Sequence, residues 1–479
     1  MKKILFAAFE GLPFIKTGGL ADVVYALPKA LDKEQYEVKV VLPLLKSVKN
    51  KYYDKLTYLD YFEVHSGYIN EGANVYKYNN EGIDYLFIEN DTFFNRDAVY
   101  GYGDDACRFS FYNVAILEMM IKLDYFPDII HTHDYHTAVL PALCKLRFNN
   151  NEKIANIKHI FTIHNLVYQG IYDKQVLFDF LAFDYRYFAD GTLRFNDSCN
   201  FMKIGIHNAD IVTTVSKTYA QEIQTSEYGE GLEMMLKYRS QDLYGIVNGI
   251  DPDIWNPKTD KIAFNYSTKN YLKGKAANKE AIQKELGLNV DPDALLVGMV
   301  SRLTFQKGAE LLSDINGEML KKHVQIIVLG TGESKYEYAF RMMEDWNKGR
   351  AVYYAGYNEE LAHSIYAGCD MLLMPSLFEP CGISQLIAMR YGTLPFVRET
   401  GGLKDTVEPY NRFTKEGRGF TFAPYNKYDM LNVFNLAYDV YTNNRDDWKI
   451  LIRNAMNYDV SFAKSAKEYE EVYEKALTK

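Results

Sequence analysis

Three basic residues stand in loops where an anionic ligand could be held. Lys16 precedes a Thr-Gly-Gly turn in "IKTGGLADVV", and Arg302 and Lys307 share one loop in "SRLTFQKGAELL". Paired glycines let a ligand approach the backbone, and the free N–H groups at the start of a helix attract anions. An arginine can hold a diphosphate with two hydrogen bonds while a lysine adds a point charge. In a transfer reaction, Arg302 and Lys307 would stabilise the negative charge that builds on a departing diphosphate.

Both motifs also have an ordinary structural interpretation. The turn at 17–19 could simply join a strand to a helix, with the Asp22 carboxylate in the first helical turn balancing the helix dipole. Arg302 and Lys307 could equally be solvated surface cations. Neither motif decides between these interpretations when it is taken alone.

A carboxylate and a helix start lie close together in "PSLFEPCGISQLIAMRYG". Glu379 falls on a loop after an expected strand, and residues 382–384 open a helix. Such a helix start could bind phosphate while Glu379 accepts hydrogen bonds from sugar hydroxyls. Cys381 has no lysine or histidine near it in sequence that would lower the pKa of its thiol. We therefore interpret it as a small packed residue and not as a nucleophile.

The Thr-Gly-Gly turn recurs near the end of the chain, in "ETGGLKDTV" from Glu399. We interpret both turns as junctions between a strand and a helix at the ligand-binding edge of a sheet. The first turn is led by a lysine and the second by a glutamate, so only the first offers a leading cation. Gly401 and Gly402 are candidates for contact with a ligand through their backbone N–H groups.

Four histidines and an aspartate gather at two expected strand ends. His131, His133 and His136 surround Asp134 in "DIIHTHDYHTAVLPAL", and His164 ends the strand in "FTIHNLVYQG". Alternate residues of a strand share a face, so a metal site is one interpretation. The cluster runs from a strand into a helix and lacks a fixed further ligand, which favours a polar ligand site built on Asp134 and some of the histidines. For His164 alone, a buried core histidine is the simpler interpretation.

Aromatic residues are abundant, with 40 tyrosines and 28 phenylalanines among 479 residues. Aromatic rings suit sugar-binding surfaces, although core filling and overall composition explain the number more simply. Tyr357 lies on a loop after the expected strand "AVYYAGY". Its ring could stack on a nucleobase or pack on the helix that follows it.

The composition is that of a globular protein, with 48% apolar and 24% charged residues. A net charge of −9 argues against broad attraction to nucleic acid or to an anionic membrane. The start "MKKILFAAFEGLPF" is interpreted as a buried strand and not as a secretory signal, because Glu10 interrupts a short apolar run. No apolar stretch approaches the ~20 residues that cross a membrane. The five cysteines are scattered without a Cys-x-x-Cys pair, which indicates reduced thiols in a cytoplasmic protein.

Short apolar runs alternate with amphipathic helical patterns along almost the whole chain. This rhythm predicts an α/β protein with parallel, doubly wound sheets. The rhythm pauses in a turn-rich stretch and restarts, and a chain of this length is expected to form two domains. We predict an N-terminal Rossmann-like domain at 1–246, a linker at 247–260, a second Rossmann-like domain at 261–455 and a terminal helix at 456–479. Ligands bind at the carboxyl ends of parallel strands, so the cleft between the domains is the expected active site.

Taken together and in order, these phrases resemble the bacterial glycogen synthase and plant starch synthase family. The phrases are Lys-Thr-Gly-Gly-Leu-Ala-Asp-Val, His-Thr-His-Asp-Tyr-His, Thr-Ile-His-Asn, Asn-Gly-Ile-Asp, Ser-Arg-Leu-x-x-Gln-Lys-Gly, Glu-Pro-Cys-Gly-x-x-Gln and "YGYGDDACRFSFYN" at 100–113. The resemblance covers essentially the whole chain. It implies two Rossmann-like domains facing a central cleft, the two-domain glycosyltransferase B-type fold, with the terminal helix crossing back to the first domain. It also implies a retaining transfer of glucose from ADP-glucose to the non-reducing end of an α-1,4-glucan such as glycogen or starch.

The family pattern implies roles for the matching residues. The residues implied to be catalytic are Lys16, Asp134, His164, Arg302, Lys307 and Glu379. The residues implied to contact the donor or its nucleotide are Gly18, Gly19, Tyr357, Cys381, Gly382, Ile383, Ser384, Gly401 and Gly402. Candidates for the acceptor or sugar site are Glu10, Asp22 and Asn248. The pattern implies neither a metal ion nor pyridoxal phosphate as a cofactor.

More finely, the resemblance implies that Arg302 and Lys307 hold the diphosphate. Asp134 and His164 would line the sugar site, and Glu379 would bind the glucose. The backbone around Ser384 would meet phosphate, and Tyr357 would pack near adenine. The pattern says nothing about oligomeric state.

Three positions depart from the family pattern. Phe9 replaces a usual serine, Gly-Ile-Ser ending at Ser384 stands where Gly-Leu-Thr is common, and Phe462 replaces a frequent tryptophan. None of these changes removes a charged group, and the hydroxyl at Ser384 is kept. The change at Phe9 bears on acceptor preference.

Other functions fit parts of the pattern. One is a UDP-glucose-dependent transferase with a small sugar acceptor, and another is a non-enzymatic glucan-binding protein on the same scaffold. The second alternative predicts lost cations, whereas Lys16, Arg302 and Lys307 are all present. A phosphorylase of similar form would require pyridoxal phosphate and would be coloured.

Overall fold

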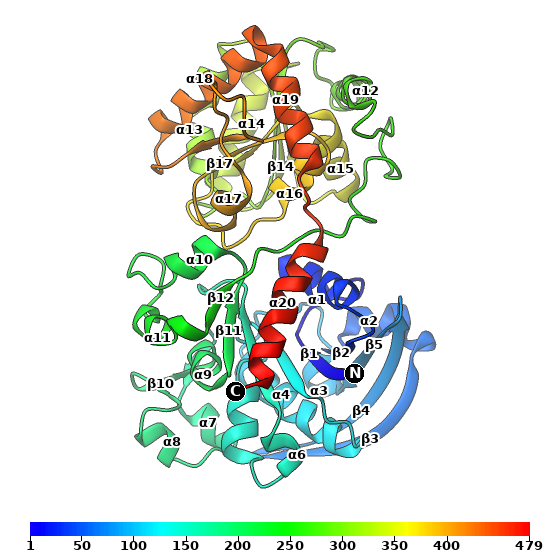
Figure 1. The fold of residues 1–479 in the computed structure, drawn as a ribbon, viewed down its shortest axis with the longest axis vertical. Helices are drawn as coiled ribbons and strands as arrows, with labels where there is room; N and C mark the ends of the chain where they lie inside the picture. Colours follow the sequence, from blue (N-terminus) through cyan, green and yellow to red (C-terminus); the bar gives the residue numbers. More distant parts are fainter. The chain divides into compact units, whose positions relative to one another are not determined.

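The computed structural model describes all residues from Met1 to Lys479 and contains two compact units. The first unit comprises Met1–Asn248 together with Phe462–Lys479, and the second comprises Gly249–Ser461. Each unit has its own central parallel sheet with helices packed on it (Figure 1). The predicted α/β fold with two Rossmann-like, doubly wound domains is therefore confirmed. The residues of the expected linker 247–260 that follow Asn248 belong to the second unit.

The sheet of the first unit has the strand order β12-β11-β7-β6-β1-β2-β5-β4-β3. Its parallel strands are β1 (Lys2–Ala7), β2 (Tyr36–Pro43), β5 (Ile83–Glu89), β6 (Ile129–His133), β7 (Lys158–Ile163), β11 (Ile211–Thr214) and β12 (Leu243–Gly245). Ile4 of β1 lies opposite Val38 on one side and Ile129 on the other. The strand order thus reverses between β1 and β6, and this reversal is where doubly wound sheets bind ligands.

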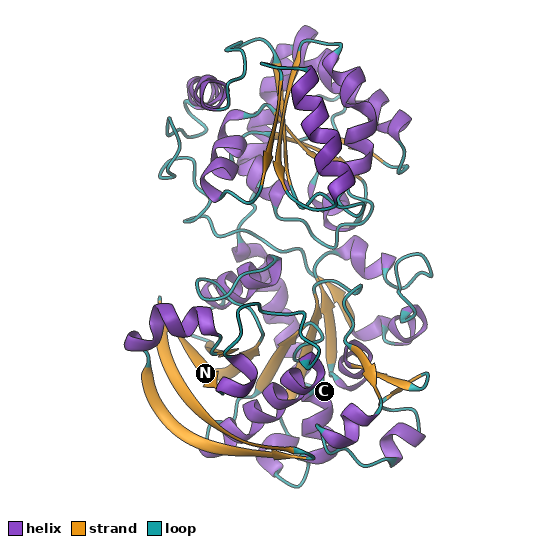
Figure 2. Cartoon of the chain, turned by 180° about the vertical axis from the view of Figure 1, so that it is seen from behind, coloured by secondary structure: helices purple, strands orange, loops and turns teal.

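Two long antiparallel strands extend this sheet at one edge. They are β3 (Thr57–Ser66) and β4 (Ile69–Asn80), and both are long and curved (Figure 2). The sequence interpretation looked for continuous buried runs and did not foresee this hairpin. In β3, exposed and buried residues alternate near Phe62 and Val64, as in a strand that faces solvent on one side. A small separate sheet is formed by β8 (Ile171–Asp173), β9 (Arg194–Phe195) and β10 (Ser198–Asn200).

The sheet of the second unit is parallel throughout, with the order β15-β14-β13-β16-β17-β18. Its strands are β13 (Leu295–Val300), β14 (Val324–Gly330), β15 (Ala351–Ala355), β16 (Met371–Met374), β17 (Leu394–Arg398) and β18 (Phe420–Phe422). Numbered within the unit, this is the 3-2-1-4-5-6 order of dinucleotide-binding sheets. The order reverses between β13 and β16, which are hydrogen-bonded neighbours.

Helices connect the strands and cover the sheets. In the first unit they are α1 (Gly19–Ala30), α2 (Lys46–Tyr52), α3 (Asp91–Phe94), α4 (Asp105–Lys122), α5 (Leu140–Ala142), α6 (Glu152–Ala155), α7 (Gln175–Asp179), α8 (Arg186–Ala189), α9 (Phe201–Asn208), α10 (Lys217–Glu222), α11 (Glu233–Tyr238) and α20 (Phe462–Leu477). In the second unit they are α12 (Tyr271–Glu285), α13 (Ala309–Leu320), α14 (Ser334–Trp346), α15 (Glu359–Gly368), α16 (Ser384–Arg390), α17 (Gly401–Thr406), α18 (Lys427–Asn443) and α19 (Arg445–Asn457). Short helical turns occupy Tyr53–Lys55, Leu143–Arg147 and Ser240–Asp242.

The terminal helix α20 is part of the first unit and packs against α1 and β7 (Figure 1). Tyr469 and Tyr473 on this helix are fully buried. The Ser465 hydroxyl donates to the carbonyl oxygen of Val247 (2.6 Å), and the Tyr473 hydroxyl lies 3.0 Å from Nδ1 of His131. The chain therefore returns to its first sheet after it completes the second.

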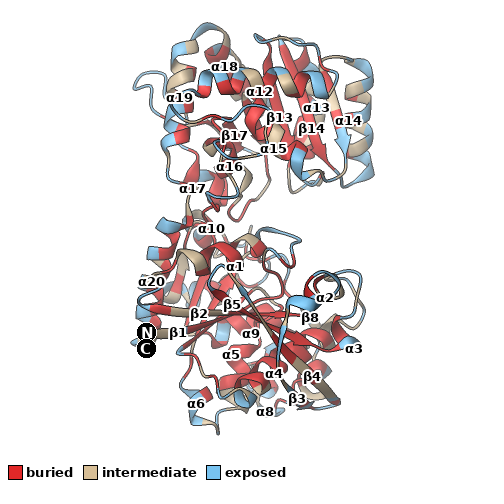
Figure 3. Cartoon of the chain, turned by 90° about the vertical axis from the view of Figure 1, so that its right-hand side faces the viewer, coloured by how far each residue is buried: buried red, intermediate tan, exposed pale blue.

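The buried residues of each unit follow its central sheet and the inward faces of its helices (Figure 3). Two lysines of α12 are exceptions because their ammonium groups are buried and fully bonded. Lys279 donates to Asp370 (2.7 Å), and Lys275 donates to the carbonyl oxygen of Cys369 (2.6 Å). All five cysteines are free thiols, and none of the helices has both the length and the apolar character needed to cross a lipid bilayer.

Candidate functional site

In the first unit, the predicted site residues follow β1, β6 and β7. The loop after β1 carries Lys16 and leads into α1, Asp134 directly follows β6, and His164 directly follows β7. These strands are neighbours in the sheet, and their carboxyl ends meet at the reversal of strand order. The topology therefore brings the three predicted residues to one edge of the sheet.

The first Thr-Gly-Gly turn is exposed to solvent. Lys16 to Gly19 are all exposed, and Gly18 caps α1 in an extended conformation with no side-chain cap. The Lys16 ammonium lies 2.9 Å from Oδ1 of Asp22. Burial raises the pKa of Asp22, and the nearby Lys16 charge only partly opposes that shift. Asp22 thus positions the lysine in addition to lying in the first turn of the helix.

The Glu10 carboxylate fixes the shape of this turn. Glu10 is buried and accepts hydrogen bonds from the Thr17 hydroxyl (2.6 Å) and the Gly18 N–H (3.2 Å). It also accepts one from the Thr17 N–H and one from the Tyr100 hydroxyl (2.6 Å). Thr17 and Tyr100 were not assigned roles from the sequence. Tyr100 is 90 residues from Glu10, so only its place in the phrase "YGYGDDACRFSFYN" could have drawn attention to it.

A buried arginine anchors the loop that carries Tyr100. Arg108 is fully buried, and its Nε donates to the carbonyl oxygen of Phe93 (2.8 Å). It also pairs with Asp105, whose other oxygen accepts the N–H of Gly101 (2.8 Å). A buried charge that is paired and hydrogen-bonded in this way resists displacement. The Glu10 contact therefore rests on a fixed loop.

Asp134 sits in a left-handed backbone conformation, with φ of +55°, at the end of β6. Its Oδ1 accepts the N–H of His164 (2.8 Å), and burial raises the pKa of Asp134 to about 7. Nε2 of His164 lies 3.1 Å from Nδ1 of His133. Burial lowers the pKa of His164 to about 3, so at neutral pH the ring is uncharged.

The other histidines of this cluster belong to the core. His131 is hydrogen-bonded to Thr162 (2.6 Å) and to Tyr473, while the His136 ring stacks on Tyr100 with centroids 4.6 Å apart. Burial lowers the pKa of His131 and of His136 to about 3. No group of three or more histidine, cysteine, aspartate or glutamate side chains is arranged to hold a metal ion.

In the second unit, a lysine and a glutamate from two neighbouring strand ends form an ion pair. Nζ of Lys307, on the loop after β13, lies 2.7 Å from Oε2 of Glu379, on the loop after β16. The Ser376 hydroxyl donates to the same carboxylate (3.0 Å). Glu379 is almost fully buried, whereas Arg302 on the β13 loop is exposed. The reversal of strand order thus places three charged side chains at one edge of this sheet.

Glycine at position 308 allows the β13 loop to approach the β16 loop. Gly308 has a φ of +73°, and a Cβ atom added there would lie 2.1 Å from the carbonyl oxygen of Pro375. Any side chain at this position would therefore push the two loops apart. This glycine ends the phrase Ser-Arg-Leu-x-x-Gln-Lys-Gly, but no role was assigned to it from the sequence.

The second Thr-Gly-Gly turn packs beneath the loop that carries Glu379. The Gly402 N–H donates to the carbonyl oxygens of Glu379 (3.2 Å) and Pro380 (3.1 Å). A Cβ atom added at Gly401 would lie 2.0 Å from the carbonyl oxygen of Glu379, and one added at Gly402 would lie 2.2 Å from that of Cys381. The Gly402 N–H is thus occupied by protein carbonyl groups, and the turn supports the Glu379 loop.

The remaining predicted residues differ in exposure. Tyr357 follows β15 and is 79% exposed. Cys381 is buried, as the packing interpretation predicts, and α16 begins at Ser384. Gly382 has a φ of +76°. Asn248 is buried, and its Oδ1 has no hydrogen-bond partner.

Two family models match the chain. The starch synthase catalytic domain matches residues 3–238, and glycosyl transferases group 1 matches residues 278–450. A glycogen synthase of Clostridium kluyveri is 44% identical over 475 residues, which cover 99% of this chain and 100% of that protein. One of Caldicellulosiruptor saccharolyticus is 46% identical over 475 residues and 99% of each chain.

Two solved structures resemble this one over 100% of both chains. The catalytic domain of starch synthase IV from Arabidopsis thaliana, bound to ADP and acarbose, has a TM-score of 0.91 and 33% sequence identity. A sucrose-phosphate synthase from Thermosynechococcus elongatus has a TM-score of 0.62 and 15% identity, a likeness that concerns the fold alone.

Proposed function

Because this chain belongs to the glycogen and starch synthase family of retaining glycosyltransferases, we propose that it transfers glucose from ADP-glucose to the non-reducing end of an α-1,4-glucan. The observation that carries this proposal is the Lys307–Glu379 pair at the strand-order reversal of the second sheet, with Arg302 on the same loop as Lys307. Cations there suit a diphosphate leaving group, and the carboxylate suits sugar hydroxyls. The ADP bound to starch synthase IV supports an adenine nucleotide as the donor.

The two units have different roles in the proposed reaction. In the second unit, Arg302 and Lys307 hold the diphosphate, and the exposed ring of Tyr357 stacks near the adenine. In the first unit, Lys16 supplies a further positive charge to the donor. Asp134 orders the His164 backbone, and both residues line the space for the transferred glucose.

The chemical step is a substitution at the anomeric carbon of the donor glucose. The 4-hydroxyl oxygen of the acceptor forms a bond to that carbon, and the bond from the carbon to the ADP oxygen breaks. ADP leaves with the electron pair of the broken bond. The hydroxyl proton passes to the departing phosphate, so the new glycosidic oxygen carries no charge. Lys307 and Arg302 stabilise the charge that grows on this phosphate. No step of this scheme uses a metal ion or pyridoxal phosphate.

We infer that retention arises by attack from the face that ADP leaves and not through a covalent glucosyl-enzyme. Glu379 is engaged by Lys307 and Ser376, and Asp134 is engaged by His164. Because burial raises the pKa of Asp134 to about 7, it is partly protonated at neutral pH and is a poor nucleophile. Intact-mass spectrometry of enzyme quenched during turnover should show no adduct. A trapped glucosyl ester on Glu379 or Asp134 would sink the inference.

The direct test of the proposed function is glucose incorporation into glycogen. Initial rates are measured with ADP-glucose and with UDP-glucose, each offered glycogen and small sugars as acceptors. We expect glycogen with ADP-glucose to give the highest kcat/KM. A preference for UDP-glucose with a small sugar would favour the alternative transferase, and no turnover with tight glycogen binding would favour a glucan-binding protein.

A further inference from the structure

A cavity in the second unit lies apart from the residues discussed so far. It encloses about 400 Å³ and is lined by residues of two segments, 252–268 and 456–461, and by Arg390. Just before the first segment, the N–H of Ile250 donates to the carbonyl oxygen of Val460 (2.8 Å), and this bond holds the two segments together. The walls of the cavity are therefore joined by backbone contacts within one unit.

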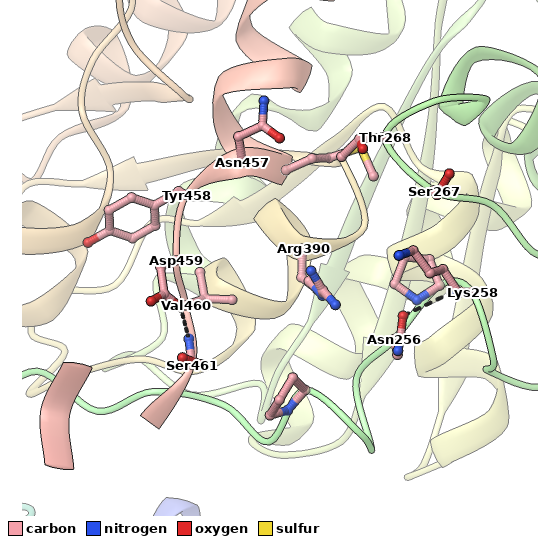
Figure 4. Close-up of a pocket in the computed structure, with 13 residues that line it drawn as sticks. Asn256, Lys258, Ser267, Thr268, Arg390, Asn457, Tyr458, Asp459, Val460 and Ser461 are labelled. Atoms are coloured by element: carbon pink, nitrogen blue, oxygen red, sulfur yellow. Dashed lines mark hydrogen bonds between the residues drawn. The ribbon is translucent and has the colours of Figure 1, made fainter. Parts of the chain in front are cut away.

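Arg390, the last residue of α16, lies between the two segments and lines the cavity (Figure 4). Its Nε atom is buried and has no hydrogen-bond partner. The partly buried Arg239 and Arg350 differ, because each donates from its guanidinium to two or more backbone carbonyl oxygens. Buried donors of native proteins are paired in the great majority of cases. Because Arg390 also lines the cavity and makes no ion pair, its guanidinium is available to a ligand there that accepts hydrogen bonds.

The chemistry of the lining indicates the class of that ligand. Lys258 adds a second positive charge, and Ser267 and Thr268 add hydroxyl groups on the same wall (Figure 4). An arginine fork together with a lysine matches the oxygens of a phosphate group. Across from them lies Asp459, whose Oδ1 accepts the N–H of Ser461 (3.0 Å). Its carboxylate would repel a bare anion, and a carboxylate can accept a further hydrogen bond from a hydroxyl.

We propose that this cavity is a binding site for a small phosphomonoester of a polyol or sugar. The phosphate group lies against Arg390 and Lys258, and the hydroxyl-bearing part extends towards Asp459. The cavity volume, about 400 Å³, falls in the range of small-molecule sites and exceeds what inorganic phosphate alone would fill. Neither Arg302 nor Lys307 lines this cavity, so the site is separate from the proposed diphosphate site.

The test is isothermal titration calorimetry of the full chain with three probes: inorganic phosphate, glycerol phosphate and a hexose monophosphate. The titrations are made in the Arg302→Ala/Lys307→Ala variant, which lacks the cations of the other proposed anion site. We expect one site per chain, with the phosphate esters binding more tightly than inorganic phosphate. Arg390→Met should weaken ester binding by about tenfold or more, on the scale of one lost charge-assisted hydrogen bond.

Two variants separate the roles of charge and geometry. Arg390→Lys keeps the charge but loses the planar fork, so its affinity should fall between those of the parent and Arg390→Met. Arg341→Met removes an exposed arginine of α14 and should leave binding unchanged. Thermal unfolding checks that each variant is folded. Lys258→Gln should also weaken ester binding, which keeps the proposal testable should Arg390→Met fail to fold.

Three results would overturn the proposal. These are no saturable binding of any ester up to about 10 mM, unchanged affinity in folded Arg390→Met, and equal affinity for inorganic phosphate and the esters. These results are independent of the proposed function. A protein that does not make glucan but shows Arg390-dependent ester binding would refute the proposed function and leave this inference standing.

Discussion

The two units carry the same Thr-Gly-Gly-Leu-x-Asp phrase in opposite structural settings. The turn of the first unit, at 17–19, is exposed, and a Cβ atom added at Gly18 would meet nothing within 4 Å. The turn of the second unit, at 400–402, is buried, and a Cβ atom added at Gly402 would lie 2.2 Å from a backbone oxygen. Both turns begin a helix after a parallel strand. The difference lies in what occupies the space above the glycines.

The charged residues that precede the two turns, Lys16 and Glu399, differ in the same way. Lys16 is exposed and held by Asp22, so it can reach a ligand above the first turn. Glu399 instead accepts a hydrogen bond from the Thr421 hydroxyl (2.6 Å) of the adjacent strand β18. The glycine pair of the second turn thus serves close backbone packing, whereas the proposed role of the first pair is to let a ligand approach. Identical residue types at identical spacing did not distinguish these two uses.

The largest loss of activity is expected on removing the Lys307 charge. Lys307 pairs with Glu379, whose loop the second turn supports. Lys307→Ala should lower kcat with ADP-glucose by roughly 100-fold or more, because it removes one donor to the departing phosphate. Lys321→Ala, which removes an exposed lysine paired with Glu318, is the matched control and should stay near the wild-type rate. Steady-state kinetics of both variants provide the check. A near-normal rate for Lys307→Ala would refute the diphosphate assignment.

The two turns should also differ in their tolerance of a methyl group. Gly402→Ala forces a contact with the backbone of Cys381 and should cost about 1–3 kcal/mol of unfolding free energy. Gly18→Ala should change it by less than about 0.5 kcal/mol, because Gly18 has extended backbone and open space around it. Urea denaturation of both variants measures the difference. Equal losses in the two variants would contradict the contrast between the turns.

Each turn lies beside a carboxylate, Glu10 or Glu399, and removing one hydroxyl donor from each carboxylate sharpens the comparison. Tyr100→Phe deletes the hydrogen bond to Glu10 and should lower kcat/KM by roughly tenfold, since Glu10 shapes the exposed turn. Thr421→Val deletes the corresponding bond to Glu399 and should leave kcat/KM within about twofold. Kinetics with ADP-glucose and glycogen compare the two. A larger loss in Thr421→Val would reverse the roles assigned to the turns.

The units should differ in sensitivity to acid as well. Burial lowers the pKa of His131, His136, His159 and His164, all in the first unit, to about 3. A folded pKa below the unfolded value of about 6.5 gives stability that is present above pH 6.5 and lost as the pH falls towards 3. Burial also raises the pKa of Asp22, Glu118 and Asp134, and these three carboxyl groups work in the opposite direction. They stand against six histidines, because burial lowers the pKa of His133 and His207 in this unit as well.

A single substitution measures the size of this effect. His159→Leu removes one buried ring whose two nitrogens have no hydrogen-bond partners. Between pH 8 and pH 6, the variant should lose about 0.8 kcal/mol less unfolding free energy than the parent. Denaturation at the two pH values tests this difference. Identical pH dependence of the variant and the parent would show that His159 does not titrate on unfolding in this range.

Much of the fold could be predicted from the sequence because most strands are buried on both faces. Continuous apolar runs such as those of β1 and β13 stand out from the helical patterns around them. The β3–β4 hairpin was missed because its strands are half exposed and alternate in polarity. The helices between strands follow from the predicted parallel arrangement.

The candidate site was predictable only in part. The residues of the first Thr-Gly-Gly turn and of the Glu379 loop lie in recognisable phrases, but their hydrogen-bond and ion-pair partners are distant in sequence. Lys307 and Glu379 are 72 residues apart, and Glu10 and Tyr100 are 90 apart. Such pairs depend on the order of strands in the sheet, which no local pattern specifies. The different surroundings of the two Thr-Gly-Gly turns have the same cause.

The central claim is that the first Thr-Gly-Gly turn acts on the donor whereas the second supports the fold. The most direct measurement is the initial rate of glucose transfer from ADP-glucose to glycogen by Lys16→Gln and by Lys404→Gln. Lys404 is the exposed lysine of the second phrase, so the two variants remove one cation from beside each turn. We predict a loss of roughly 100-fold for Lys16→Gln and a change within about twofold for Lys404→Gln. Near-wild-type rates in both variants, or equal losses, would contradict the claim.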